Sequence, residues 1–146
     1  MPAPKFSIVV CNWDTARSEA RRIRELVFVH EQGVPLELEM DEQDPQCDHA
    51  LAYAADGTVV GTGRLLPDGH IGRMAVLAHS RGQGVGGLLL QALVQQARRR
   101  GHTRARLNAQ VHALGFYRRF GFDVDGAEFM EAGIPHQAMQ CELKRG

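Results

Sequence analysis

The chain has 146 residues with 17 Lys plus Arg and 17 Asp plus Glu, so its net charge predicts no partner. Its three cysteines show no Cys-x-x-Cys spacing and predict neither a disulfide framework nor a zinc site. There is no apolar leader and no stretch long enough for a membrane helix. We therefore expect one domain over residues 1–146, in the cytoplasm and away from membranes.

The first third of the chain predicts a strand, a helix and a long loop. Phe6 to Cys11 is rich in β-forming residues, and Asp14 or Thr15 can cap a helix that runs to His30. The apolar positions of this helix recur at helical spacing: Ala16, Ala20, Ile23, Leu26, Val27 and His30. The segment from Glu31 to Asp48 has no convincing period and is expected to be a loop.

The remainder predicts six strands and two helices. Asp56-Gly57 lies between two β-type runs and is a hairpin signal. The expected strands are His49 to Ala54, Thr58 to Leu66, Ile71 to Leu77, Thr103 to Asn108, Phe122 to Val124 and Gln137 to Leu143. Helices are expected from Val85 to Ala97 and from Ala113 to Phe120. This order predicts an α+β fold with a mixed, largely antiparallel sheet flanked by helices.

The most informative stretch is Arg81-Gly82-Gln83-Gly84-Val85-Gly86-Gly87. It joins the expected strand Ile71 to Leu77 to the expected helix that begins at Val85. Glycines permit positive φ angles and let consecutive N–H groups point toward one site at the positive end of a helix dipole. A diphosphate can bind there without a metal. The alternative is a strand-to-helix turn that needs glycine for conformational reasons alone.

Two well-known phosphate motifs fit this stretch poorly. Gly82, Gly84 and Gly87 match the G-x-G-x-x-G pattern of dinucleotide oxidoreductases, but that pattern requires an acidic residue about twenty positions later. No Asp or Glu occurs from Gly69 through Phe122. A P-loop is excluded because no Gly-Lys-Ser/Thr closes the turn.

A third pattern fits better. Arg81, Gly84 and Gly86 form Arg-x-x-Gly-x-Gly after a strand with Met-Ala-Val, and this resembles the coenzyme A loop of the GNAT acyltransferase superfamily. That superfamily's A-x-x-x-Y-x-x-x-G-F stretch is matched at Ala113, Tyr117, Gly121 and Phe122. Further segments resemble its small ElaA- and YjcF-like bacterial branch: Arg24-x-x-Val27-Phe28, Glu31-Gln32, Asp41-x-x-Asp44, His49 and Gly133-Ile134-Pro135-His136.

The resemblance implies a GNAT-like fold and a coenzyme A-dependent acyltransferase, most simply an N-acetyltransferase that uses acetyl-CoA without a metal. It places the pyrophosphate at Arg81, Gly82, Gln83, Gly84, Val85, Gly86 and Gly87, and the pantetheine arm along the backbone of Met74, Ala75 and Val76. It makes Tyr117 the proton donor to the departing thiolate and Asn108 or Gln110 a hydrogen-bonding partner of the cofactor. The alternative is a non-catalytic acyl-CoA-binding or regulatory protein, against which Tyr117 argues.

The general base is less well defined. Six side chains are candidates: Glu31, Asp41, Asp44, His49, His112 and His136. No spacing singles out a pair, and we take His136 forward with Tyr117 as the catalytic candidates. The acceptor amine stays open between small molecules and peptides, and so does the oligomeric state, for which a homodimer is one option.

Charge is divided unevenly along the chain. Gly69 through Phe122 holds nine arginines and no acid, whereas Glu31 through Gly63 holds eight acids and no Lys or Arg. A phosphate-bearing cofactor would be attracted to the first segment and a cationic amine to the second. Nucleic acid is disfavoured as a partner because the arginines lack interleaved aromatic residues and a recognisable module.

Overall fold

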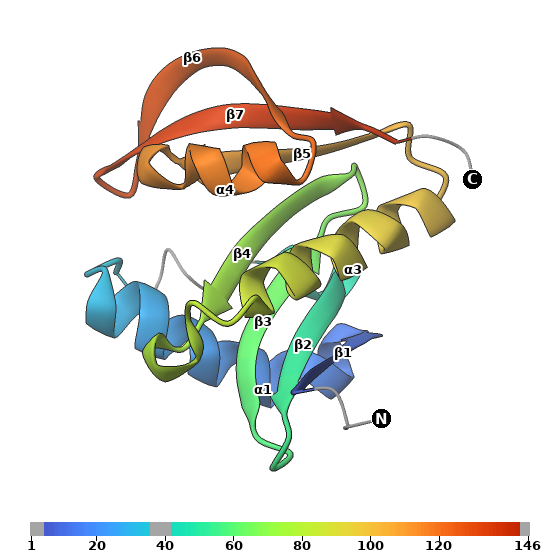
Figure 1. Ribbon diagram of the computed structural model, residues 1–146, viewed down its shortest axis with the longest axis vertical. Helices are drawn as coiled ribbons and strands as arrows, with labels where there is room; N and C mark the ends of the chain where they lie inside the picture. The colour runs from blue at the N-terminus through green and yellow to red at the C-terminus, as the bar shows by residue number, and fades with distance from the viewer. Residues whose placement is uncertain (1–4, 36–41, 144–146) are drawn as a thin grey trace.

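The computed structural model describes residues 5–35 and 42–143 and has one seven-stranded sheet in the order β1-β2-β3-β4-β5-β7-β6 (Figure 1). The strands are β1 (Phe6–Cys11), β2 (Asp48–Ala54), β3 (Val59–Leu65), β4 (His70–Val76), β5 (Arg104–Gln110), β6 (Asp123–Glu131) and β7 (Ile134–Glu142). The α-helices are α1 (Trp13–Arg24), α3 (Val85–Arg99) and α4 (Leu114–Arg119). The β4–β5 pair is parallel and the other pairs are antiparallel, so the predicted α+β fold is confirmed.

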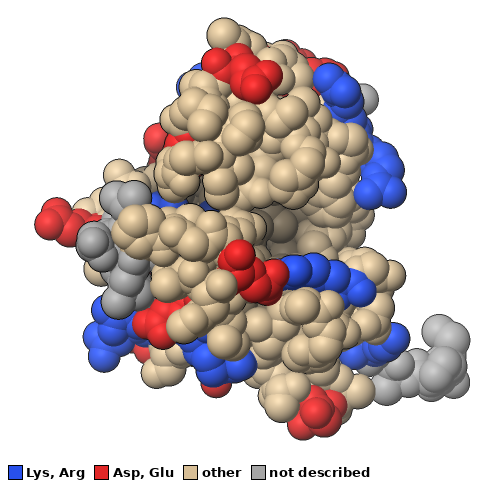
Figure 2. All heavy atoms as spheres, turned by 90° about the vertical axis from the view of Figure 1, so that its left-hand side faces the viewer, with Lys and Arg blue, Asp and Glu red and all other residues tan. Residues whose placement is uncertain are grey.

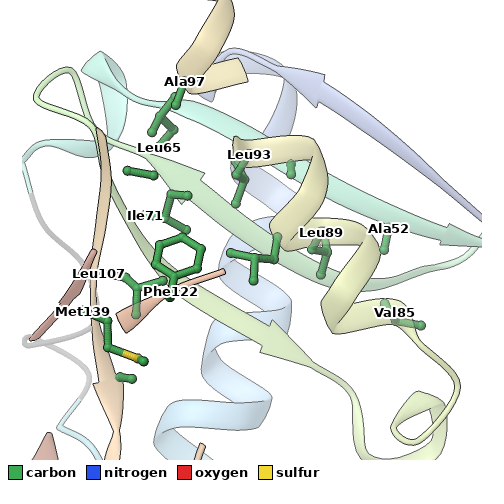
Figure 3. Close-up of a cluster of buried hydrophobic side chains, with 14 of the residues drawn as sticks. Ala52, Leu65, Ile71, Val85, Leu89, Leu93, Ala97, Leu107, Phe122 and Met139 are labelled. Carbon is green, nitrogen blue, oxygen red and sulfur yellow. The ribbon is translucent and has the colours of Figure 1, made fainter. Parts of the chain in front are cut away.

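Helices α1 and α3 lie on opposite faces of the β1–β4 part of the sheet (Figure 1). Successive residues of a strand point to opposite faces, so Ala50 and Ala52 of β2 pack with the α3 core while Leu51 packs with the α1 core. Figure 3 shows Leu89 and Leu93 of α3 directed at the sheet, within the buried cluster that also contains Phe122. In the described ranges, no helix combines the length and apolarity needed to cross a membrane.

The first helix departs from the prediction at both ends. Its cap is Asn12, whose Oδ1 accepts a hydrogen bond of 3.0 Å from the Thr15 amide, so the prediction of Asp14 or Thr15 was wrong. The α-helix ends at Arg24, and the chain continues as a π-helical segment, Glu25–Glu31. The wider π turn changes which residues face the core, and Leu26 is 41% exposed although its spacing predicted burial.

The last hairpin is longer than predicted. Strands β6 and β7 meet at a two-residue turn in which Ala132 and Gly133 both have positive φ, 52° and 76°. Such angles are typical of the type I′ turns that match strand twist. Most of β6 is exposed, so the apolar alternation that reveals a half-buried strand is missing.

The two halves of the sheet separate between β4 and β5. The strands pair at one end, where His70 lies opposite Arg106 and Ile71 opposite Leu107. Both then continue, β4 to Val76 and β5 to Gln110, without further pairing between these two fully described strands. The divergence leaves the later part of β4 without a partner strand on this side.

Candidate functional site

Two cavities occupy the region where β4 and β5 diverge, and Figure 2 shows the surface hollowed there. The loop cavity, of about 870 Å³, is lined by the glycine stretch and the first turns of α3. The hairpin cavity, of about 560 Å³, is lined by the turn end of the β6–β7 hairpin. Four residues line both: Gln32, Met74, Ala113 and Tyr117. The two cavities therefore meet at Tyr117.

The glycines of the loop serve two different purposes. Gly82 and Gly84 have φ angles of 75° and 87°, and a Cβ atom at either would meet nothing within 4 Å, so conformation requires glycine there. Gly84 immediately precedes α3, whose first N–H groups lack helical acceptors and can bind an anion. At Gly87 a Cβ atom would lie 2.7 Å from Phe120 Cζ, so glycine is needed there for helix packing.

Arg81 anchors this loop through its side chain. Its Nε donates to the Val76 carbonyl at 2.9 Å, and its two terminal nitrogens donate to the Glu31 carboxylate at 2.9 and 2.8 Å. The hydrogen bond from Arg81 holds the pKa of Glu31 below its ordinary value. Glu31, one of the candidate bases, is thus an ion-pair partner of the loop. Arg81 holds the loop in place, because its side chain is bonded to Val76 and Glu31.

A β-bulge shapes the edge of β4 that faces both cavities. Arg73 and Met74 together lie opposite Gly63, and Arg73 has a φ of 51°. A Cβ atom on Gly63 would lie 2.8 Å from Leu93 Cδ1 and 3.0 Å from Met74 Cγ, so the bulge requires glycine beneath it. Beyond the bulge, the β4 backbone lines the loop cavity and can pair with an extended ligand chain.

Tyr117 projects from α4 into the junction between the cavities. Its ring packs edge-on against Phe116, with centroids 5.0 Å apart, and against Phe122 at 6.2 Å. Burial raises the pKa of the phenol above its ordinary value, so the hydroxyl stays protonated at neutral pH. A neutral, fixed phenol is suited to donating a proton.

His136 lines the hairpin cavity, and its side chain is 8% exposed. Its Nδ1 donates to the Ile134 carbonyl at 2.7 Å, which leaves Nε2 as the basic atom. Nε2 lies 3.4 Å from the carboxylate of Glu131, which is 52% exposed at the rim. Glu131 was not among the predicted site residues, because no strand was expected between Val124 and Gln137. Residues 123–131 show no apolar alternation, and Glu131 reaches the cavity only through the pairing of β6 with β7, in which Phe129 lies opposite His136 and Glu131 opposite Ile134.

Asp44 and His49, two further base candidates, belong to a buried structural network. Asp44 pairs at 2.9 Å with both Arg24 and Arg64, and its backbone carbonyl accepts a 2.9 Å hydrogen bond from His49 Nε2. Trp13 covers this group, 4.7 Å from the His49 ring and 5.3 Å from the Arg24 guanidinium carbon. Both residues are buried and neither lines a cavity, so neither is placed to accept a proton from a substrate.

The other predicted residues divide between the cavities. Asn108 and Gln110 line the hairpin cavity, not the loop cavity where the phosphate stretch lies. Gln110 Nε2 donates to Gln32 Oε1 at 3.1 Å, and Gln110 Oε1 lies 2.7 Å from His112 Nε2. These three hydrogen-bonded side chains therefore connect the two cavities. Gln83 is turned toward the His79 carbonyl at 3.2 Å.

Much of the predicted charge lies away from both cavities. Six of the nine arginines between Gly69 and Phe122 line neither: Arg98, Arg99, Arg100, Arg104, Arg106 and Arg118. Arg100 instead forms a bidentate ion pair with Asp48, at 2.9 and 2.8 Å. Of the acidic stretch, Glu37, Glu39 and Asp41, including the last base candidate, lie outside the described residues.

The architecture and the loop agree with a comparison of the chain with known proteins. The chain matches the model of the acetyltransferase (GNAT) domain over residues 18–143. It belongs to the GNAT acetyltransferase family. This GNAT chain is 38% identical to the uncharacterized N-acetyltransferase YjcF of Bacillus subtilis over 135 residues, which cover 90% of this chain and 96% of YjcF.

Two solved GNAT-like structures agree with this assignment. An acyl-CoA N-acyltransferase from Pseudomonas aeruginosa is 30% identical to this chain, with a TM-score of 0.83. The superposition covers 93% of this chain and 99% of the Pseudomonas chain. Escherichia coli ElaA is 27% identical with a TM-score of 0.82, covering 94% and 99%. The predicted resemblance to the ElaA- and YjcF-like branch is confirmed, and a dinucleotide oxidoreductase is ruled out.

Proposed function

We propose that this GNAT chain transfers an acetyl group from acetyl-CoA to a primary amine. The observation that carries the proposal is that Tyr117 lines both cavities, with Gln32, Met74 and Ala113 beside it. An acyl donor in the loop cavity and an amine in the hairpin cavity would meet next to a protonated phenol. A non-catalytic acyl-CoA-binding protein has no use for a second cavity that opens onto the thioester.

The lining of the loop cavity supports coenzyme A as its ligand. The left-handed glycines Gly82 and Gly84 and the first N–H groups of α3 would bind the pyrophosphate without a metal. Met74 to Val76 pair with β3 on one side only, and the backbone groups on their other side that Arg81 does not engage would hydrogen-bond the pantetheine amides in the manner of an added strand. This order directs the thioester toward Tyr117.

Proton transfers set the chemical requirements of the acceptor side. An alkylammonium with a pKa near 10 is only about one part in a thousand neutral at pH 7, so deprotonation must be assisted. His136 Nε2 would take this proton, and the Glu131 carboxylate 3.4 Å away would stabilise the imidazolium before the proton passes to solvent. The Nδ1 bond to Ile134 holds the ring in the required tautomer.

The transfer step then balances without any further reactant. The amine nitrogen bonds to the thioester carbonyl carbon, and the carbon–sulfur bond breaks as the carbonyl re-forms. Tyr117 donates its hydroxyl proton to the departing sulfur, and the remaining excess proton on nitrogen restores the phenol through water. The products are the amide and the coenzyme A thiol, with one proton released from the original ammonium.

The test is a free-thiol release assay with acetyl-CoA against a panel of small-molecule and peptide amines, with mass analysis of the products. We expect amine-dependent thiol release, one added acetyl group on the amine, and unchanged binding heats for coenzyme A in EDTA. Coenzyme A binding without amine-dependent release from any acceptor class would favour the non-catalytic alternative. Loss of binding on chelation would contradict the metal-free cradle.

We assign the enzyme to the reducing cytoplasm, in keeping with three free cysteines.

A further inference from the structure

The loop cavity is lined by cationic side chains and by no carboxylate among the described residues. Its charged lining residues are Arg81 and Arg119. The Arg81 guanidinium is engaged by Glu31 and the Val76 carbonyl. Arg119 is exposed, makes no ion pair with any described residue, and lies over the Phe116 ring at 5.8 Å. Arg119 is therefore the cation that this cavity offers to a ligand.

The face of α4 that carries Arg119 packs against the start of α3. Phe116, Arg119 and Phe120 are at positions i, i+3 and i+4 and so share one face. A Cβ atom on Gly86 would lie 3.4 Å from Phe116 Cζ, and one on Gly87 would lie 2.7 Å from Phe120 Cζ. Arg119 is thus fixed beside the phosphate loop, on a different side of the helix from Tyr117.

We propose that Arg119 binds the 3′-phosphate of coenzyme A, an inference that rests on the proposed function. With the pantetheine along Met74 to Val76 and the pyrophosphate at the loop, the ribose phosphate falls beyond the loop, away from Tyr117. Backbone N–H groups suffice for the pyrophosphate, whereas a terminal phosphate monoester presents oxygens that a guanidinium can bind in bidentate fashion. Leu88, 39% exposed on the first turns of α3, offers apolar surface to the adjoining base.

Calorimetric titration with coenzyme A and with 3′-dephospho-coenzyme A tests this assignment. The variants are Arg119→Gln and, as a matched control, Arg118→Gln, which removes the neighbouring charge from a residue that does not line the cavity. We expect the wild-type protein to bind coenzyme A about tenfold more tightly than the dephospho form, the scale of one charge-assisted contact. Arg119→Gln should abolish this preference by weakening coenzyme A alone, and Arg118→Gln should retain it.

The contrary outcomes are distinct. Equal weakening of both ligands in Arg119→Gln would place Arg119 at the pyrophosphate or in helix packing, and unchanged affinity for both would leave it in solvent. Either result overturns the inference. Arg119→Lys keeps a positive charge and should retain part of the preference, which separates loss of charge from damage to α4. If the wild-type protein binds neither ligand, the proposed function itself fails.

Discussion

The loop cavity and the hairpin cavity are built on different principles. The loop cavity comes largely from one continuous stretch, Met74 to Gln91, and offers backbone groups held by glycine geometry. The hairpin cavity gathers side chains from segments far apart in sequence, among them Arg64, His136 and Glu131. Donor binding should therefore depend on local chain conformation. Acceptor handling should depend on individual side chains and on the buried contacts that support them.

The largest expected effect concerns the support beneath the hairpin cavity. Asp44→Asn leaves Arg24 and Arg64 buried with reduced compensation, so we expect a loss of about 3–5 kcal/mol in the free energy of unfolding. Urea denaturation followed by the fluorescence of Trp13, the single tryptophan, measures this directly. Coenzyme A affinity of the folded protein should be unchanged.

Asp48→Asn is the matched control for the Asp44 variant. Its partner Arg100 has a side chain that is 58% exposed, so the loss of stability should be clearly smaller than in Asp44→Asn. Equal losses of unfolding free energy in the two variants would show that the buried ion pairs stabilise the fold no more than the exposed one.

The second effect is expected at the candidate base. His136→Gln removes the basic Nε2 from the hairpin cavity, and kcat/KM should fall by about 10² or more while coenzyme A affinity stays constant. His30→Gln is the control, because His30 is exposed and lines neither cavity. Steady-state kinetics with the best amine decides. A normal rate in His136→Gln would assign deprotonation to water or another group.

The third effect tests the loop. Gly84→Val forces a β-branched residue toward a φ of 87°, at a cost of about 1–3 kcal/mol, and should weaken coenzyme A binding at least about tenfold. Gly57→Val imposes the same kind of strain at a φ of 88° in the β2–β3 turn, away from both cavities. Both variants should lose similar stability in calorimetry, but only Gly84→Val should lose affinity. Equal affinities would show that the ligand binds elsewhere.

This division also explains what could be predicted from sequence. The loop and the hairpin at Asp56-Gly57 depend on local glycine chemistry, which the sequence displays, whereas the role of Tyr117 was implied by the resemblance to the GNAT A-x-x-x-Y-x-x-x-G-F stretch. Glu131 and the full length of β6 depend on pairing with β7 across an exposed surface, where burial leaves no alternation. The sequence suggested Glu31 as a base and did not reveal that it pairs with Arg81, because the two residues are fifty positions apart.

The smallest expected effect is a pH dependence of stability. Burial lowers the pKa of His49, so below its unfolded value of about 6.5 the unfolded chain binds a proton that the folded protein does not. Stability should therefore fall on acidification from pH 7 to pH 5, by at most about 1.4 kcal/mol per pH unit. His49→Gln should show a shallower fall in urea denaturation. Parallel curves for the two proteins would mean that His49 does not titrate differently on folding.

The central claim is that donor and acceptor meet at a proton-donating Tyr117, and the most direct test is Tyr117→Phe. This change keeps the ring against Phe116 and Phe122 but removes the hydroxyl. We expect kcat to fall by about 10² or more, least for acyl donors with a more acidic leaving thiol, while the Kd for coenzyme A is unchanged. Normal turnover, or a joint loss of affinity and rate, would contradict the account.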